Sequence, residues 1–120
     1  MYKEANQALQ RAENIIEQTY MITGEIKLLP VALQSVHKAA ELAWLETKDN
    51  KKPFFLHQME RILEKKKQSP LEFQRKNNFI ICTNKLETIS INKEKLQVFI
   101  QKTKEYIQKC KKKKIAQKKN

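Results

Sequence analysis

His57 and Arg61 are the residues of this chain whose types and spacing come closest to a catalytic pair. They lie four positions apart, which places them one turn apart on the exposed side of a predicted helix. In RNA cleavage a histidine can act as the general base, and an arginine can stabilise the phosphorane. The simpler interpretation is two solvent-facing helix residues, and the pattern favours it.

His37 is the other histidine, at the edge of a second predicted helix and one turn before Glu41. We expect it to be a boundary residue that hydrogen-bonds to Glu41 or to solvent. The alternative is a general base or a metal ligand. The remaining candidate ligands, His57, Cys82 and Cys110, show no paired spacing, so the sequence predicts no metal site.

Glycine and cysteine usage narrows the possible functions further. Gly24 is the only glycine, which excludes P-loops and dinucleotide-binding loops because these need several glycines. We therefore expect no cofactor. Cys82 and Cys110 lie far apart, which is typical of packed thiols in a reduced, cytoplasmic protein, and a disulfide between them is the alternative. No apolar stretch approaches the roughly 18–20 residues of a membrane span, and the first residues lack an apolar signal region.

Charge is distributed unevenly along the chain, whose formal net charge is +12. Residues 1–60 contain 7 Lys and Arg against 8 Asp and Glu, whereas residues 61–120 contain 18 against 5. A neutral half joined to a basic half favours a negatively charged partner: nucleic acid first, an anionic membrane surface second and an acidic protein third. Most of the cations are lysines, which favours non-specific attraction over the reading of bases.

The basic residues that we expect to contact phosphate lie in three groups of the second half. Phosphate contacts need cations in number, because released counterions supply much of the affinity. The alternative is a solvated charged face that aids solubility. Stacking aromatics are not expected, since Phe73, Phe79 and Phe99 look like core residues. Only Phe54 falls off its helix stripe. The candidate nucleic-acid-binding residues are Lys65, Lys66, Lys67, Arg75, Lys76, Lys111, Lys112, Lys113 and Lys114.

Apolar spacing predicts a mainly α fold, a four-helix antiparallel bundle with a small β-hairpin between helices three and four. The hairpin is predicted over residues 79–91. Ser69-Pro70-Leu71-Glu72 has the form of a capping box that starts a short helical turn through Phe73. Asn92 is expected to cap the last helix. The predicted helices cover residues 4–20, 25–47 and 54–66, and a last one begins at residue 93 in a single domain over residues 1–110, followed by a basic flexible tail over residues 111–120.

Two stretches of the first two helices carry a resemblance to a known family. Ala8-Leu9, Arg11-Ala12-Glu13 and Ile16, followed by residues 36–43 (Val-His-Lys-Ala-Ala-Glu-Leu-Ala), resemble the HEPN family of small helical domains over residues 4–47. HEPN ribonucleases carry an Arg, then about four to six residues, then a His, and no Arg of this chain is followed in that way. The resemblance therefore implies a non-catalytic member, similar to RNA-binding or partner-binding subunits, some of which pair with a small nucleotidyltransferase. Residues 69–82 also resemble a segment of small uncharacterised archaeal proteins.

Together these observations predict a basic helical module that binds RNA or another polyanion without catalysis. Two alternatives stay open. One is an HEPN-type ribonuclease or toxin component that uses His57 and Arg61. The other is a protein–protein adaptor or dimerising subunit whose apolar helical faces bind a partner chain or a second copy.

Overall fold

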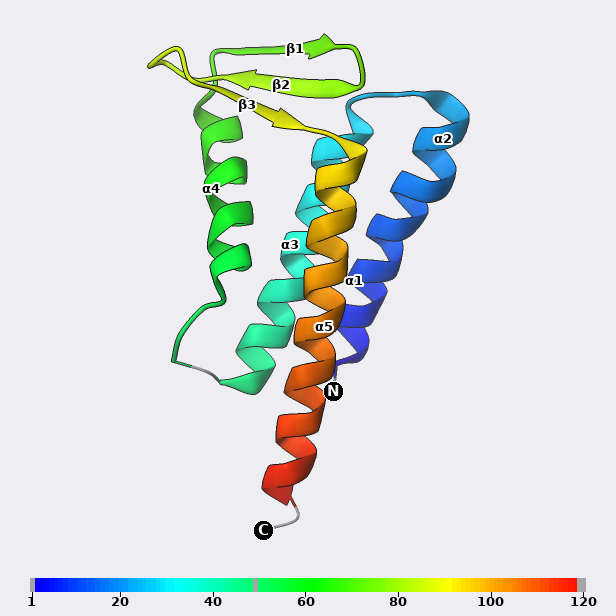
Figure 1. Ribbon diagram of the computed structural model, residues 1–120, viewed down its shortest axis with the longest axis vertical. Helices are drawn as coiled ribbons and strands as arrows, with labels where there is room; N and C mark the ends of the chain where they lie inside the picture. Colours follow the sequence, from blue (N-terminus) through cyan, green and yellow to red (C-terminus); the bar gives the residue numbers. More distant parts are fainter. Residues whose placement is uncertain (1, 49, 119–120) are drawn as a thin grey trace.

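The computed structural model describes residues 2–48 and 50–118, with side chains through residue 113. Within this part the chain is mainly helical, with four long helices and a small antiparallel sheet (Figure 1). The long axis measures 53 Å, with the sheet at one end and the C-terminal part of the last helix at the other. None of the helices in the described ranges combines the length and the apolar character that crossing a membrane requires.

The first helical segment extends past its predicted end at residue 20. α1 (Lys3–Asn14) continues through a π-helical turn, η1 (Ile15–Thr19), into α2 (Tyr20–Thr23). Gly24 then ends the segment at φ 64°, in the left-handed region that glycine adopts without steric cost. The chain reverses there and returns along α1.

α3 (Leu28–Thr47) is the central helix, and it packs against α1, against α4 (Phe54–Gln68) and against α5 (Lys93–Lys118). It can contact three neighbours because its apolar residues lie around most of its circumference. It begins later than the predicted residue 25. Pro30 is buried in its first turn, where the missing N–H costs no helical hydrogen bond.

α4 packs on α3 through Leu56, Met59 and Ile62, all of which are buried. It also contacts α5 through the rings of Phe55 and Tyr106, which meet edge to face with centroids 5.8 Å apart. Three lysines occupy the last turn of α4, where positive charge is favoured by the helix dipole. The chain then passes directly from these lysines into the sheet.

The sheet has three strands instead of the predicted two, because residues 71–75 are a strand and not a helical turn. β1 (Leu71–Arg75), β2 (Asn78–Cys82) and β3 (Thr88–Ile91) pair antiparallel in that order. The predicted capping box is wrong: the hydroxyl of Ser69 donates to the carbonyl of Cys82 at 2.7 Å and accepts from the N–H of Leu71 at 3.3 Å. Ser69 thus ties the start of β1 to the end of β2.

α5 begins as predicted, because Asn92 Oδ1 accepts a hydrogen bond from the backbone N–H of Lys95 at 2.8 Å. The predicted apolar stripe is buried through Cys110, and the side chains of residues 111–113 are exposed. The helical backbone nevertheless continues to Lys118, past residue 110 where the flexible tail is predicted to begin. Residues 119–120 lie outside the described part. The buried stripe of α5 consists of Leu96, Phe99, Ile100, Thr103, Ile107 and Cys110.

Candidate functional site

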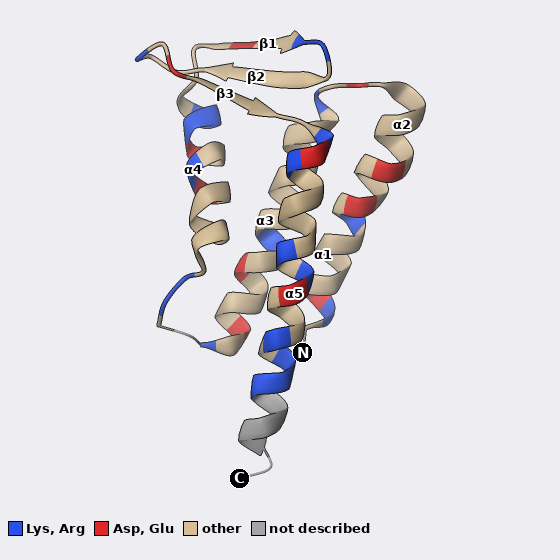
Figure 2. Ribbon diagram, viewed as in Figure 1, with Lys and Arg blue, Asp and Glu red and all other residues tan. Residues whose placement is uncertain are grey.

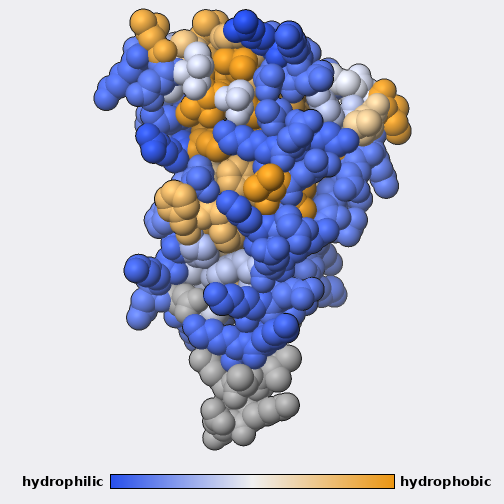
Figure 3. All heavy atoms as spheres, in the orientation of Figure 1, coloured by the Kyte–Doolittle hydropathy of each residue, from blue (hydrophilic) through white to orange (hydrophobic). Residues whose placement is uncertain are grey.

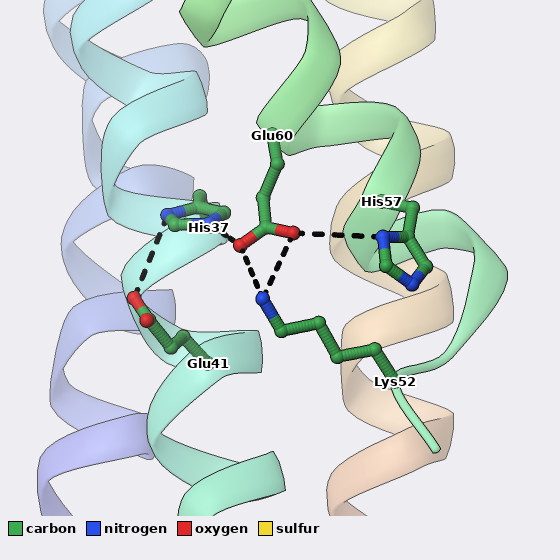
Figure 4. A network of polar contacts seen from close by, with 5 residues as sticks. All are labelled: His37, Glu41, Lys52, His57 and Glu60. Atoms are coloured by element: carbon green, nitrogen blue, oxygen red, sulfur yellow. Dashed lines mark hydrogen bonds and ion pairs between the residues drawn. The ribbon is translucent and has the colours of Figure 1, made fainter.

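A network of polar side chains joins α3, α4 and the loop between them, with Glu60 at its centre (Figure 4). Lys52 Nζ donates to both carboxylate oxygens of Glu60, at 2.9 and 3.2 Å. His37 Nε2 lies 3.3 Å from Glu60 Oε2, and His57 Nδ1 lies 3.8 Å from Glu60 Oε1. The other ring nitrogen of His37 lies 3.9 Å from Glu41 Oε2, beyond hydrogen-bond distance, so His37 hydrogen-bonds to Glu60 and only lies near the predicted partner Glu41.

The electrostatics of this network keep Glu60 ionised. Burial raises the pKa of Glu60, but the hydrogen bonds and positive charges of Lys52 and His37 more than offset burial, so the pKa is lowered overall. Both carboxylate oxygens are already engaged with Lys52. In the part of the chain that the structure describes, no three His, Cys, Asp or Glu side chains are arranged to hold a metal ion.

Lys52 has a second contact that anchors the loop before α4. Its ammonium lies 5.0 Å from the centroid of the Trp44 ring, a cation–π distance. Lys52 therefore connects the end of α3 with Glu60 on α4. The carboxylate of Glu60 is surrounded by partners from the chain itself, which indicates a structural role. We call the contacts of His37, Lys52 and Glu60, which hold α3 and α4 together, the clasp.

The proposed catalytic pair, His57 and Arg61, is exposed on α4 as predicted, but the two side chains have different neighbours. His57 is 60% exposed and lies beside Glu60. Arg61 instead lines a surface hollow of about 370 Å³ together with Lys65, Lys85 and Glu87. His57 does not line that hollow.

A second hollow, of about 440 Å³, lies between α3 and α4. It brings Lys66 and Lys67 near the polar network, because His37 and Glu60 also line it. Besides these two lysines, two carboxylates line it, those of Glu60 and Glu64. The hollow therefore has a mixed charge and offers no strong preference for an anion.

Two of the predicted phosphate-binding lysines are engaged with carboxylates of the sheet region. Lys65 Nζ lies 3.1 Å from Glu87 Oε2, and this hydrogen bond lowers the pKa of Glu87. Lys66 Nζ lies 3.3 Å from Glu72 Oε1 and 5.8 Å from the centroid of the Phe79 ring. These contacts join the end of α4 to the sheet region, and they partly neutralise the charge of Lys65 and Lys66.

Arg75 is the last residue of β1 and Lys76 follows it in the turn to β2, and both are exposed. Lys76 has a positive φ of 55°, and its carbonyl accepts a hydrogen bond from Gln74 Nε2 at 3.1 Å. Asn78 Nδ2 donates to the carbonyl of Arg75 at 3.4 Å. Among the described residues, neither Arg75 nor Lys76 has an acidic side chain within ion-pair distance. The end of β1 and the turn after it therefore present two cations to solvent, and Lys67 is a third exposed cation at this end.

The predicted basic residues do not form one continuous surface. Lys111, Lys112 and Lys113 are exposed on the C-terminal part of α5, at the opposite end of the molecule from the sheet (Figure 2). The side chain of Lys114 lies outside the described residues. The sequence places all these cations in one half of the chain, but the long α5 helix separates them in space.

Phe73 is a residue that the sequence analysis assigns wrongly. It is predicted to be in the core, but it is 41% exposed on β1. Leu71, Phe73 and Arg75 alternate with Glu72 and Gln74, which is the period-two signal of a strand. That alternation could have identified an exposed aromatic beside an arginine. The capping-box interpretation of the preceding residues concealed it.

Comparison with protein-family models, curated proteins and solved structures finds no match to this chain. The resemblance of residues 4–47 to HEPN domains therefore stays a prediction. The same holds for the resemblance of residues 69–82 to small archaeal proteins.

Proposed function

We propose that the protein binds RNA or another polyanion without catalysis, and that the sheet end of the molecule makes the main contact. The observation that carries this proposal is that three of the predicted phosphate-binding residues lie exposed at the sheet end: Lys67, Arg75 and Lys76. The nearby carboxylates of Glu72 and Glu87 are engaged by Lys66 and Lys65. Positive charge at this end is therefore left available to an external anion.

The physical basis is the release of counterions from a phosphate backbone, which requires cations on the surface but no enclosed pocket. The exposed lysines at the end of α5, Lys111, Lys112 and Lys113, add long-range attraction at the other end. The free thiols of Cys82 and Cys110 support a reduced setting, and we propose that the protein acts in the cytoplasm. A non-catalytic HEPN-like subunit would fit the same activity.

The test is a titration of the protein against labelled single-stranded RNA and duplex DNA at several salt concentrations. We expect the logarithm of the affinity for RNA to fall with the logarithm of salt, at about −0.7 per phosphate contact. Replacing Lys67, Arg75 and Lys76 together with Gln should lower the affinity and reduce this slope by about 2, because roughly three phosphate contacts are lost.

A matched control variant removes three positive charges from another part of the surface. Lys3, Lys27 and Lys38 are exposed on the N-terminal half, and their replacement with Gln should change the slope much less. The triple Gln variant of Lys111, Lys112 and Lys113 should have an intermediate effect. Absence of binding at low salt would refute the proposal, and equal losses in all three variants would refute the assignment to the sheet end.

A further inference from the structure

One face of the sheet points away from the helices, and the strand register identifies its residues. Phe79 and Ile81 on β2 are buried against the helices, so the alternate residues of β2 point to the other side. Directly paired residues share a face, and Phe73 pairs with Ile80. We call this surface the outer sheet face, and it consists of Leu71, Phe73, Arg75, Asn78, Ile80, Cys82, Thr88 and Ser90.

The outer sheet face is unusually apolar for a surface without a partner in the chain. Leu71 is 55% exposed and Phe73 is 41% exposed, and Ile80 and Cys82 are partly exposed beside them. Figure 3 shows apolar side chains gathered over the sheet at this end of the molecule. None of the eight residues is acidic, and Arg75 lies at the end of the face.

We infer, on the basis of the proposed function, that the outer sheet face binds the unpaired bases of a single-stranded nucleic acid. One base stacks on the ring of Phe73, and its neighbours lie against Leu71 and Ile80. Every base has a π-face, so an exposed aromatic on a sheet accepts any base, and a duplex cannot use it because its bases are already stacked.

The positions of the nearby cations match this ligand. Phe73 and Arg75 are two residues apart on one strand, so their Cα atoms are separated by about 7 Å. The guanidinium of Arg75 can then reach a phosphate next to the stacked base, and Lys76 follows in the turn. Charge complementarity also favours a polyanion over a second copy of the chain, since each copy carries a net charge of +12.

The decisive variant is Phe73→Ala, compared on two ligands that share charge but differ in bases. The ligands are a short oligouridylate and inorganic polyphosphate of similar charge. The variant should bind the oligouridylate roughly 5- to 150-fold more weakly, the range expected from losing one stacked base. Its affinity for polyphosphate should stay within experimental error of the parent chain, because Arg75 and Lys76 are unchanged.

Two further variants exclude trivial explanations. Phe73→Tyr keeps the ring and should restore most of the affinity for the oligouridylate. Phe54→Ala removes an aromatic side chain that is 75% exposed on α4, away from the sheet, and should change neither affinity. Circular dichroism and thermal unfolding of each variant test whether the fold is retained.

The outcomes separate this inference from the function on which it rests. If the parent chain binds neither ligand at low salt, both are wrong. If it binds both ligands and Phe73→Ala weakens neither, polyanion binding stands and base stacking is refuted. If the parent chain is a dimer in solution and Phe73→Ala makes it a monomer, the outer sheet face is an interface between copies, and base stacking is again refuted.

Discussion

Glu60 on α4 accepts a hydrogen bond from His37 on α3, with 3.3 Å between Oε2 and Nε2. The two residues are 23 positions apart in the chain, and this contact joins the helices that carry them. Lys52 completes the clasp from the loop between α3 and α4. Only Ser69 and Pro70 separate the end of α4 from the sheet, so contacts that hold α4 on α3 also help to position the sheet.

The clasp predicts a loss of stability in acid. Glu60 has a folded-state pKa below its ordinary value of 4.5, so ionisation of Glu60 stabilises the fold above that value. The stabilisation is lost as the pH falls through the lowered pKa. Urea unfolding from neutral pH down to about pH 3 should therefore show a steeper loss for the parent chain than for Glu60→Gln.

Glu64→Gln is the control for this measurement, because Glu64 is exposed on the same helix. Its pH profile should follow that of the parent chain. Identical profiles for the parent chain and Glu60→Gln would show that Glu60 is not stabilised in the fold.

Truncating a side chain on each face of β2 should lower the free energy of unfolding by different amounts. Ile81 is fully buried, so Ile81→Ala should lower the free energy of unfolding by about 2–5 kcal/mol through lost burial and the cavity left behind. Ile80 is its neighbour on the outer sheet face, and Ile80→Ala should cost much less. Denaturant unfolding of both variants measures the difference, and a larger cost at Ile80 would contradict the strand register.

The hydrogen bonds of Asn92 at the start of α5 predict that replacing this residue lowers the stability of the fold. Asn92 Oδ1 accepts from the N–H of Lys95, and Asn92 Nδ2 donates to Asn78 Oδ1 at 3.0 Å on β2. Asn92→Ala should lower the free energy of unfolding by about 1 kcal/mol or somewhat more. Asn92→Ser keeps a capping oxygen and should lose less. Equal losses in thermal unfolding would mean that the cap contributes nothing.

The surroundings of His57 and Arg61 predict that RNA is bound but not cleaved. His57 lies 3.8 Å from Glu60, whereas Arg61 lines a hollow that His57 does not reach. Labelled RNA incubated with the protein should stay intact, and His57→Ala should bind RNA as the parent chain does. Gel analysis of the products measures this, and cleavage that disappears in His57→Ala would favour the ribonuclease alternative.

Local pattern was sufficient to predict several elements of the fold. The stripe of α5 from Leu96 to Cys110 is buried, and Asn92 caps that helix. Both predictions depend on neighbours within a few turns, which a sequence displays directly. Residues 71–75 were wrongly predicted to begin as a helical turn, because Ser69-Pro70-Leu71-Glu72 has the form of a capping box. The hydrogen bond that shows the role of Ser69 in the sheet goes to Cys82, which is 13 positions away.

The candidate site depended more strongly on contacts between distant residues. The sequence shows Lys65 and Arg75 as equivalent cations, but Lys65 is held by Glu87 and Arg75 is exposed. The sequence also predicts Phe73 in the core, at the end of a short helical turn. Pairing with β2 instead places Phe73 on the outer sheet face.

The sequence by itself determined the helical character of the chain, the apolar stripes that form its core and the excess of positive charge in its second half. These properties depend on composition and on periods of a few residues, so they need no knowledge of the fold. The tertiary structure decided which cations are neutralised, which end of the molecule they occupy and which face of the sheet is exposed. Those outcomes depend on strand pairing and helix packing between distant segments, and no local pattern encodes them.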